Sequence, residues 1–134
     1  MHASGHSLTL SVLRGRLAVC RLAPLHPGES LPVWASVGDI YSITQTAEEL
    51  SVVCDEDAVP KGVTSELGWR CLKAHGPFDF SMVGVLASLT GPLAAAGISI
   101  FALSTYDTDY LLVKDEDLEG AIEVLLQQGH AVLR

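Results

Sequence analysis

Between Asp79 and Asp107 the chain carries no charged side chain, and this run limits what the sequence can fold into more than any other feature. The run is long enough to cross a bilayer. However, it is interrupted by Gly84, Gly91 and Pro92, and it lacks the basic flanks and aromatic belts of a membrane span. Its first part has helical spacing and its second part is rich in strand-forming residues, which favours a buried helix followed by a buried strand. We therefore expect no membrane association.

The residues around this run predict six elements in the order strand, helix, strand, strand, helix, strand. They lie at residues 69–76, 82–96, 98–105, 109–114, 117–128 and 130–134. Gly97 and Gly129 are natural helix stops, Asp115 is a good N-cap for the second helix, and Pro92 predicts a kink or break near Gly91. The order is that of a ferredoxin-like βαββαβ unit. The predicted fold class is α+β, with an antiparallel sheet and helices on one face.

The first half of the chain predicts strands and turns without a long helix. "LTLSVLRG" and "RLAVCRL" alternate well enough to pair around Arg14 and Gly15. "IYSITQT" and "ELSVVCDE" predict a hairpin about Ala47 and Glu48, and "VWASV" predicts a short helical turn. We place the domain boundary so that residues 1–67 form the first half and residues 68–134 the second.

Charge and motif content exclude several function classes. The formal net charge of −8, without a Lys/Arg cluster, makes DNA or RNA an unfavourable partner. Cys20, Cys54 and Cys71 lie in apolar strands without metal-type spacing, which predicts buried free thiols, and the five histidines share no ligand spacing. No phosphate loop, Cys–His or His–carboxylate motif is present. We therefore expect no metal, no cofactor and no enzymatic activity.

Localisation and assembly follow from two further features. Unpaired cysteines and the lack of a signal peptide favour a cytoplasmic protein. The strand at 98–105 should lie at the edge of the sheet, yet it is apolar on both faces, with Ile100 and Phe101 pointing in opposite directions. Such an edge needs a cover, so we predict a homodimer; the alternative is that the two halves of one chain cover each other.

Residues 16–132 resemble the ACT-domain proteins related to the CASTOR arginine sensors. The most specific part is "ISIFALSTYDTDYLLV" at 98–113, supported by "TAEELSVVC" and "GWRCLK". The resemblance implies tandem ACT modules, of which residues 1–67 are a shorter, ACT-like first half and residues 68–134 a full βαββαβ domain. It also implies a regulatory protein that binds an amino acid where modules meet.

By motif position, the resemblance assigns ligand contacts to Tyr106 and Asp109, and to the loop before the first helix. The loop residues are Ser81, Met82, Val83 and Gly84.

The residues themselves are consistent with this chemistry, because a helix start exposes N–H groups for a carboxylate and a carboxylate can hold an ammonium group. Three alternatives remain. Asp107 and Asp109 could be turn residues of a polar hairpin tip. Tyr106 could serve packing. The whole chain could be an oligomerisation or protein-interaction module without a ligand. The sequence leaves the identity of the amino acid open.

Overall fold

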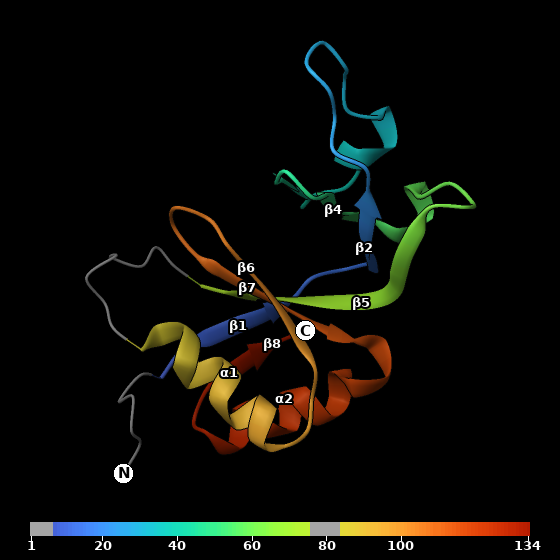
Figure 1. Ribbon diagram of the computed structural model, residues 1–134. Coiled ribbons are helices and arrows are strands. Elements are labelled where there is room, and N and C mark those ends of the chain that lie inside the picture. The colour runs from blue at the N-terminus through green and yellow to red at the C-terminus, as the bar shows by residue number, and fades with distance from the viewer. Residues whose placement is uncertain (1–6, 76–83) are drawn as a thin grey trace. The chain divides into compact units, whose positions relative to one another are not determined.

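The chain forms two compact units, and one of them is inserted into the other along the sequence. The computed structural model describes residues 7–75 and 84–134 (Figure 1). The inserted unit is residues 15–69, and the split unit combines residues 1–14 with residues 70–134. This division differs from the expected boundary at residue 67, because the first strand belongs to the sheet of the second half of the chain.

In the described residues, the sheet of the split unit has the strand order β8-β1-β5-β7-β6. The strands are β1 (Thr9–Val12), β5 (Thr64–Ala74, from Arg70 onward), β6 (Ile100–Ser104), β7 (Asp109–Lys114) and β8 (Ala131–Leu133). The predicted strand–helix–strand–strand–helix–strand order is confirmed from β5 to β8, and β6 is an edge strand as expected. One pair departs from the antiparallel expectation, since β1 pairs in parallel with β8 and antiparallel with β5.

Two helices, α1 (Val85–Ala95) and α2 (Leu118–Gln127), lie on one face of this sheet (Figure 1). The buried side chains of α1 and α2 recur at spacings of three and four residues, which makes one stripe on each helix apolar. These stripes and the strands form one core. Its fully buried leucines are Leu10, Leu72, Leu89, Leu93, Leu111 and Leu125. This core therefore joins the first strand of the chain to the second half.

Both helices end as the sequence predicted, at a glycine in the left-handed conformation. Gly97 has φ 79° and Gly129 has φ 90°. The N–H group of Ile98 donates to Leu93 O at 3.0 Å and that of His130 donates to Leu125 O at 3.1 Å, the six-to-one bond of a Schellman motif. Helix α1 is continuous across Gly91, so the expectation of a break there is wrong, whereas the alternative of a kink stays a prediction.

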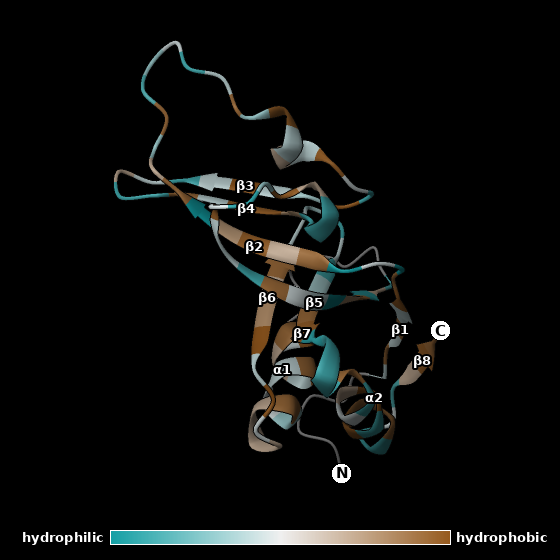
Figure 2. Cartoon of the chain, turned by 90° about the vertical axis from the view of Figure 1, so that its right-hand side faces the viewer, coloured by the Kyte–Doolittle hydropathy of each residue, from teal (hydrophilic) through white to brown (hydrophobic). Residues whose placement is uncertain are grey.

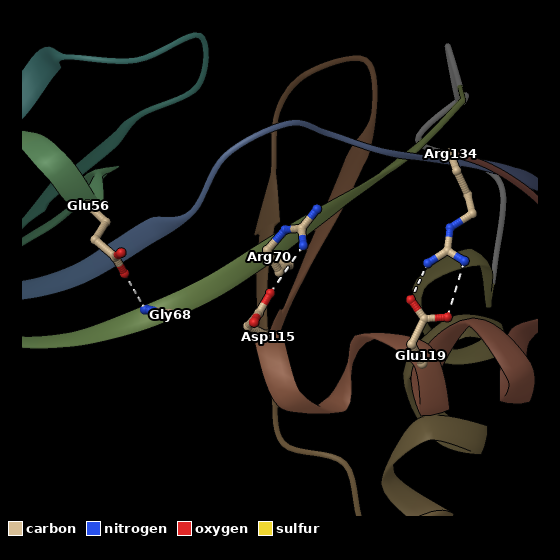
Figure 3. A network of polar contacts seen from close by, with 6 residues as sticks. All are labelled: Glu56, Gly68, Arg70, Asp115, Glu119 and Arg134. Carbon is tan, nitrogen blue, oxygen red and sulfur yellow. Dashed lines mark hydrogen bonds and ion pairs between the residues drawn. The ribbon is translucent and has the colours of Figure 1, made fainter.

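The start of α2 also differs from the prediction. A 3₁₀ turn (Asp115–Asp117) precedes the helix, and the N-cap is Asp117 rather than Asp115. The Asp115 carboxylate instead accepts a hydrogen bond from the Arg70 guanidinium at 3.1 Å (Figure 3). This ion pair ties the start of α2 to β5.

The inserted unit is a four-stranded antiparallel sheet in the order β3-β4-β2-β5. Its strands are β2 (Leu17–Leu22), β3 (Ser42–Gln45), β4 (Leu50–Asp55) and the first part of β5. The predicted β3–β4 hairpin and the helical turn (Val33–Ser36) are confirmed. However, β1 and β2 do not pair with each other around Gly15, because each pairs with β5 instead.

The core of the inserted unit contains small, β-branched and leucine side chains, including Cys20, Leu50 and Val52. Figure 2 shows the apolar residues concentrated on strands such as β2 and β6.

Glu56 also accepts a hydrogen bond from the N–H group of Gly68 at 2.6 Å, which holds the turn after β4 against β5 (Figure 3).

Candidate functional site

The β6–β7 hairpin carries the polar residues that the sequence singled out, and its tip is held by its own threonines. Ser104 and Asp109 are the last register partners of the two strands. Between them, the N–H group of Thr105 donates to Thr108 O at 2.9 Å, and the N–H group of Thr108 donates to Thr105 Oγ1 at 3.3 Å. The tip is therefore a closed polar turn of defined geometry.

Thr108 fixes this tip to the end of β5. The residue is 8% exposed, and its hydroxyl donates a hydrogen bond to the carbonyl oxygen of Ala74. Sequence reasoning missed this residue, because a threonine next to an aspartate is equally typical of a turn and of a strand. The bond places the tip at the end of the sheet where β5 ends.

Asp109 is half-buried and is held in place by a neighbour across the hairpin. The hydroxyl of Ser104 donates to Asp109 Oδ1 at 2.6 Å. Within residues 7–75 and 84–134, the second carboxylate oxygen has no hydrogen-bond partner. The carboxylate is thus oriented by one contact and retains capacity for another donor.

The two other polar residues of the tip are more exposed. Asp107 lies in the exposed turn, and the Tyr106 side chain is 79% exposed. This chain therefore offers an aromatic ring and two carboxylates on a short segment.

The start of α1 is the second part of the predicted site. Gly84 is its N-cap, with φ 82°, and it provides no side chain for capping. The first hydrogen bond within the helix runs from the Ser88 N–H group to Gly84 O at 2.9 Å. The N–H groups of residues 85–87 lie before this bond and so have no partner within the helix. Figure 1 shows the start of α1 and the hairpin tip at the same end of the split unit. Ser81, Met82 and Val83 lie outside the described residues.

The three cysteines are buried free thiols, as predicted. Burial raises the pKa of the Cys54 thiol to about 11 and that of the Cys71 thiol to about 12, and it also raises the pKa of Cys20. Such thiols are neutral near pH 7, whereas nucleophilic and metal-binding cysteines act as thiolates. The cysteines therefore serve packing rather than chemistry.

Two further properties concern the described part of the chain. No group of three or more His, Cys, Asp or Glu side chains in residues 7–75 and 84–134 is arranged to hold a metal ion. In the same residues, no helix has the length and apolar character needed to cross a membrane.

Two protein-family models match this chain. The ACT-domain model matches residues 64–127, and a model of an N-terminal domain matches residues 15–62. The second match coincides closely with the inserted unit.

Curated relatives include the human cytosolic arginine sensor for mTORC1 subunit 1, which is 37% identical over 84 residues. That match covers 57% of this chain but 26% of the sensor, so the chain spans about a quarter of the sensor's length. The human putative protein CASTOR3P is 33% identical over 91 residues, covering 58% of this chain and 56% of the relative.

Two solved structures illustrate the similarity of the fold. A protein from Agrobacterium tumefaciens is 40% identical, with a TM-score of 0.87 over 96% of this chain and 94% of that one. The regulatory subunit of aspartate kinase from Thermus thermophilus is 13% identical, with a TM-score of 0.63 over 89% of this chain and 95% of that one, and it shows the fold alone.

Proposed function

Since this chain belongs to the ACT-domain family and is homologous to the cytosolic arginine sensors, we propose that it is a regulatory protein that binds an amino acid where two ACT modules meet. We also propose that the protein is cytoplasmic, has no catalytic activity and uses no cofactor. The similarity to the cytosolic arginine sensors supports it, and the aspartate kinase regulatory subunit shares the fold.

The observation that carries the proposal is the state of the Asp109 carboxylate. This group is half-buried and oriented by Ser104, and it keeps one oxygen without a partner among the described residues. An ammonium group is a matching donor for that oxygen. In the proposed complex Asp109 binds the ligand's ammonium group and Tyr106 covers the ligand. Backbone N–H groups at the start of α1 bind the ligand's carboxylate. The proposed site also includes the loop residues Ser81, Met82, Val83 and Gly84.

A thermal-shift screen with the twenty amino acids tests the function. A ligand present at 100 times its dissociation constant stabilises the folded state by about 2.7 kcal/mol. For a chain of this size that corresponds to a melting temperature higher by about 8 °C. A screen without a shift for any amino acid would instead favour the oligomerisation or interaction module.

Two isosteric variants test the site by calorimetry with the amino acid that the screen identifies. Asp109→Asn keeps an oxygen for the Ser104 hydroxyl but removes the charge. We expect binding about ten- to a hundredfold weaker, because a charge-assisted hydrogen bond contributes roughly 1.5–3 kcal/mol. Asp107→Asn removes the same charge from the exposed turn and should change the affinity little. A large loss of affinity for Asp107→Asn alone would show that Asp107, and not Asp109, contacts the ligand.

The homodimer is part of the same proposal. Among the described residues, β6 pairs only with β7, and its other edge remains open for a second copy. Light scattering of a dilute sample should give twice the monomer mass of 14.2 kDa. A uniform monomer would refute the dimer.

A further inference from the structure

A groove lies on the helical side of the split unit, away from the hairpin tip. It holds about 320 Å³ and runs between the C-terminal end of α1 and the exposed side of α2. Its apolar residues are Ala96, Ile98 and Val124, and its acidic residues are Glu116, Asp117 and Glu123. The volume is at the lower end of the range for small-molecule sites, and it suits one or two side chains.

Gly120 lines this groove, and the helix does not need a glycine there. A Cβ atom at residue 120 would meet only Ile98 Cδ1, at 4.0 Å, which is ordinary contact. A glycine inside a helix costs about 1 kcal/mol relative to alanine. Packing therefore does not explain this residue. Its consequence is local, because the missing methyl group deepens the groove towards Ile98.

The acidic residues of this segment fall into two groups. Asp115 is paired with Arg70, and Glu119 is paired with Arg134, whose Nη1 lies 3.1 Å from Glu119 Oε1 (Figure 3).

The second group lines the groove. Within residues 7–75 and 84–134, the side chains of Glu116, Asp117 and Glu123 make no hydrogen bond or ion pair. Among residues 115–123, the carboxylates without a partner are therefore gathered at the groove, whereas the paired ones are outside it.

Helix electrostatics explain part of this pattern. Acidic residues before and within the first turn of α2 stabilise the positive end of the helix dipole, and this accounts for Glu116 and Asp117. Glu123 lies in the second turn, where the effect has faded. The C-terminal end of α1 at Ala96 adds a partial negative charge on the opposite wall. The groove therefore combines an apolar floor with a negative field.

We propose that this groove docks a basic segment of a protein partner, through one arginine or lysine side chain. The aliphatic stem of that side chain lies over Ile98 and Val124, and its cationic head faces Glu123 and Asp117. Charge complementarity is the argument for this occupant. No cluster of side chains among the described residues is arranged to hold a metal ion. The chemistry of the groove therefore favours a long organic cation over a metal ion. The docking site does not depend on the proposed amino-acid site.

The test is a titration of the ¹⁵N-labelled chain with the blocked peptide acetyl-Ala-Leu-Arg-Leu-Ala-amide, followed by amide chemical shifts. The matched control peptide carries citrulline, which keeps the shape of arginine without its charge. We expect shifts at Ile98, Gly120 and Val124 with the arginine peptide and none with the citrulline peptide. Equal shifts with both peptides would overturn the proposal, and so would arginine-peptide shifts confined to other residues.

Variants of the groove sharpen the test. Glu123→Gln should weaken binding about two- to fivefold, the usual contribution of one exposed ion pair. Glu119→Gln removes the same charge from the same helix outside the groove and should leave the affinity unchanged. Gly120→Ala should weaken binding while raising the melting temperature by about 3 °C, which separates loss of the site from loss of the fold.

Two further outcomes would also refute the proposal. One is equal weakening by Glu119→Gln and Glu123→Gln, because the peptide would then respond only to net charge. The other is the same set of shifts with free arginine or with magnesium chloride at the peptide's concentration, which would assign the groove to a small cation.

Discussion

The assignment of β1 to the split unit can be tested with one core substitution, Leu10→Ala. Leu10 is fully buried in the core that contains both helices, although it precedes the inserted unit in the sequence. Removing a buried leucine side chain costs about 3 kcal/mol, within a usual range of about 2–5 kcal/mol. For a domain of this length the whole free energy of unfolding is about 7–20 kcal/mol. The substitution therefore removes a readily measurable part of this free energy of unfolding.

Native-state hydrogen exchange measures where that stability is lost. A loss of 3 kcal/mol lowers amide protection about a hundredfold. We expect this decrease for the amides of β7, with much less change for those of β4 in the inserted unit. Leu50→Ala is the matched control, because Leu50 is 1% exposed in the core of the inserted unit and should produce the opposite pattern. Equal loss in β4 and β7 after Leu10→Ala would refute the reasoning, since the chain would then unfold as one body.

Three further predictions concern single contacts. Thr108→Val leaves the carbonyl oxygen of Ala74 without its donor and should lower the free energy of unfolding in urea by about 1–3 kcal/mol; no change would mean that water replaces the hydroxyl. Gly129→Ala places a Cβ atom at φ 90° and should lower stability by about 1–2 kcal/mol, measured by thermal circular dichroism. Because burial raises the pKa of Cys71 from its ordinary value of 9.0 to about 12, the unfolded state loses its proton first as pH rises. The contribution of Cys71 is therefore constant below pH 9 and decreases above it, so Cys71→Ala should reduce the decline in urea midpoint between about pH 9 and 10.5. An unchanged decline would contradict the raised pKa.

Local patterns predicted most of the elements but not the partner of the first strand. Helical spacing and the stops at Gly97 and Gly129 depend on neighbouring residues, so α1 and α2 could be read directly from the sequence. The pairing of β1 with β8 joins residues more than a hundred positions apart. Alternation in residues 8–12 is compatible with any partner strand, and for that reason β1 was assigned to the first half of the chain.

The same distinction applies to the hairpin. That Asp109 lies opposite Ser104 follows from hairpin register, and a count across the turn would have revealed it. The bond from Thr108 to Ala74 joins residues 34 positions apart, and no local signal announces it. The unpaired state of Glu123 also depends on tertiary structure, because its sequence neighbours do not indicate which acids find an arginine.

The position of β1 between β8 and β5 affects how the chain must fold during its synthesis. The inserted unit is complete once residue 69 has left the ribosome, and all its strand pairs are then available. The strand β1 is made earlier, yet one of its two neighbours, β8, ends at residue 133. The strand β1 therefore stays without β8, one of its two partners, while the remainder is translated, at about 5–20 residues per second. In the cell, this interval is when the nascent chain is most dependent on chaperones and most exposed to aggregation.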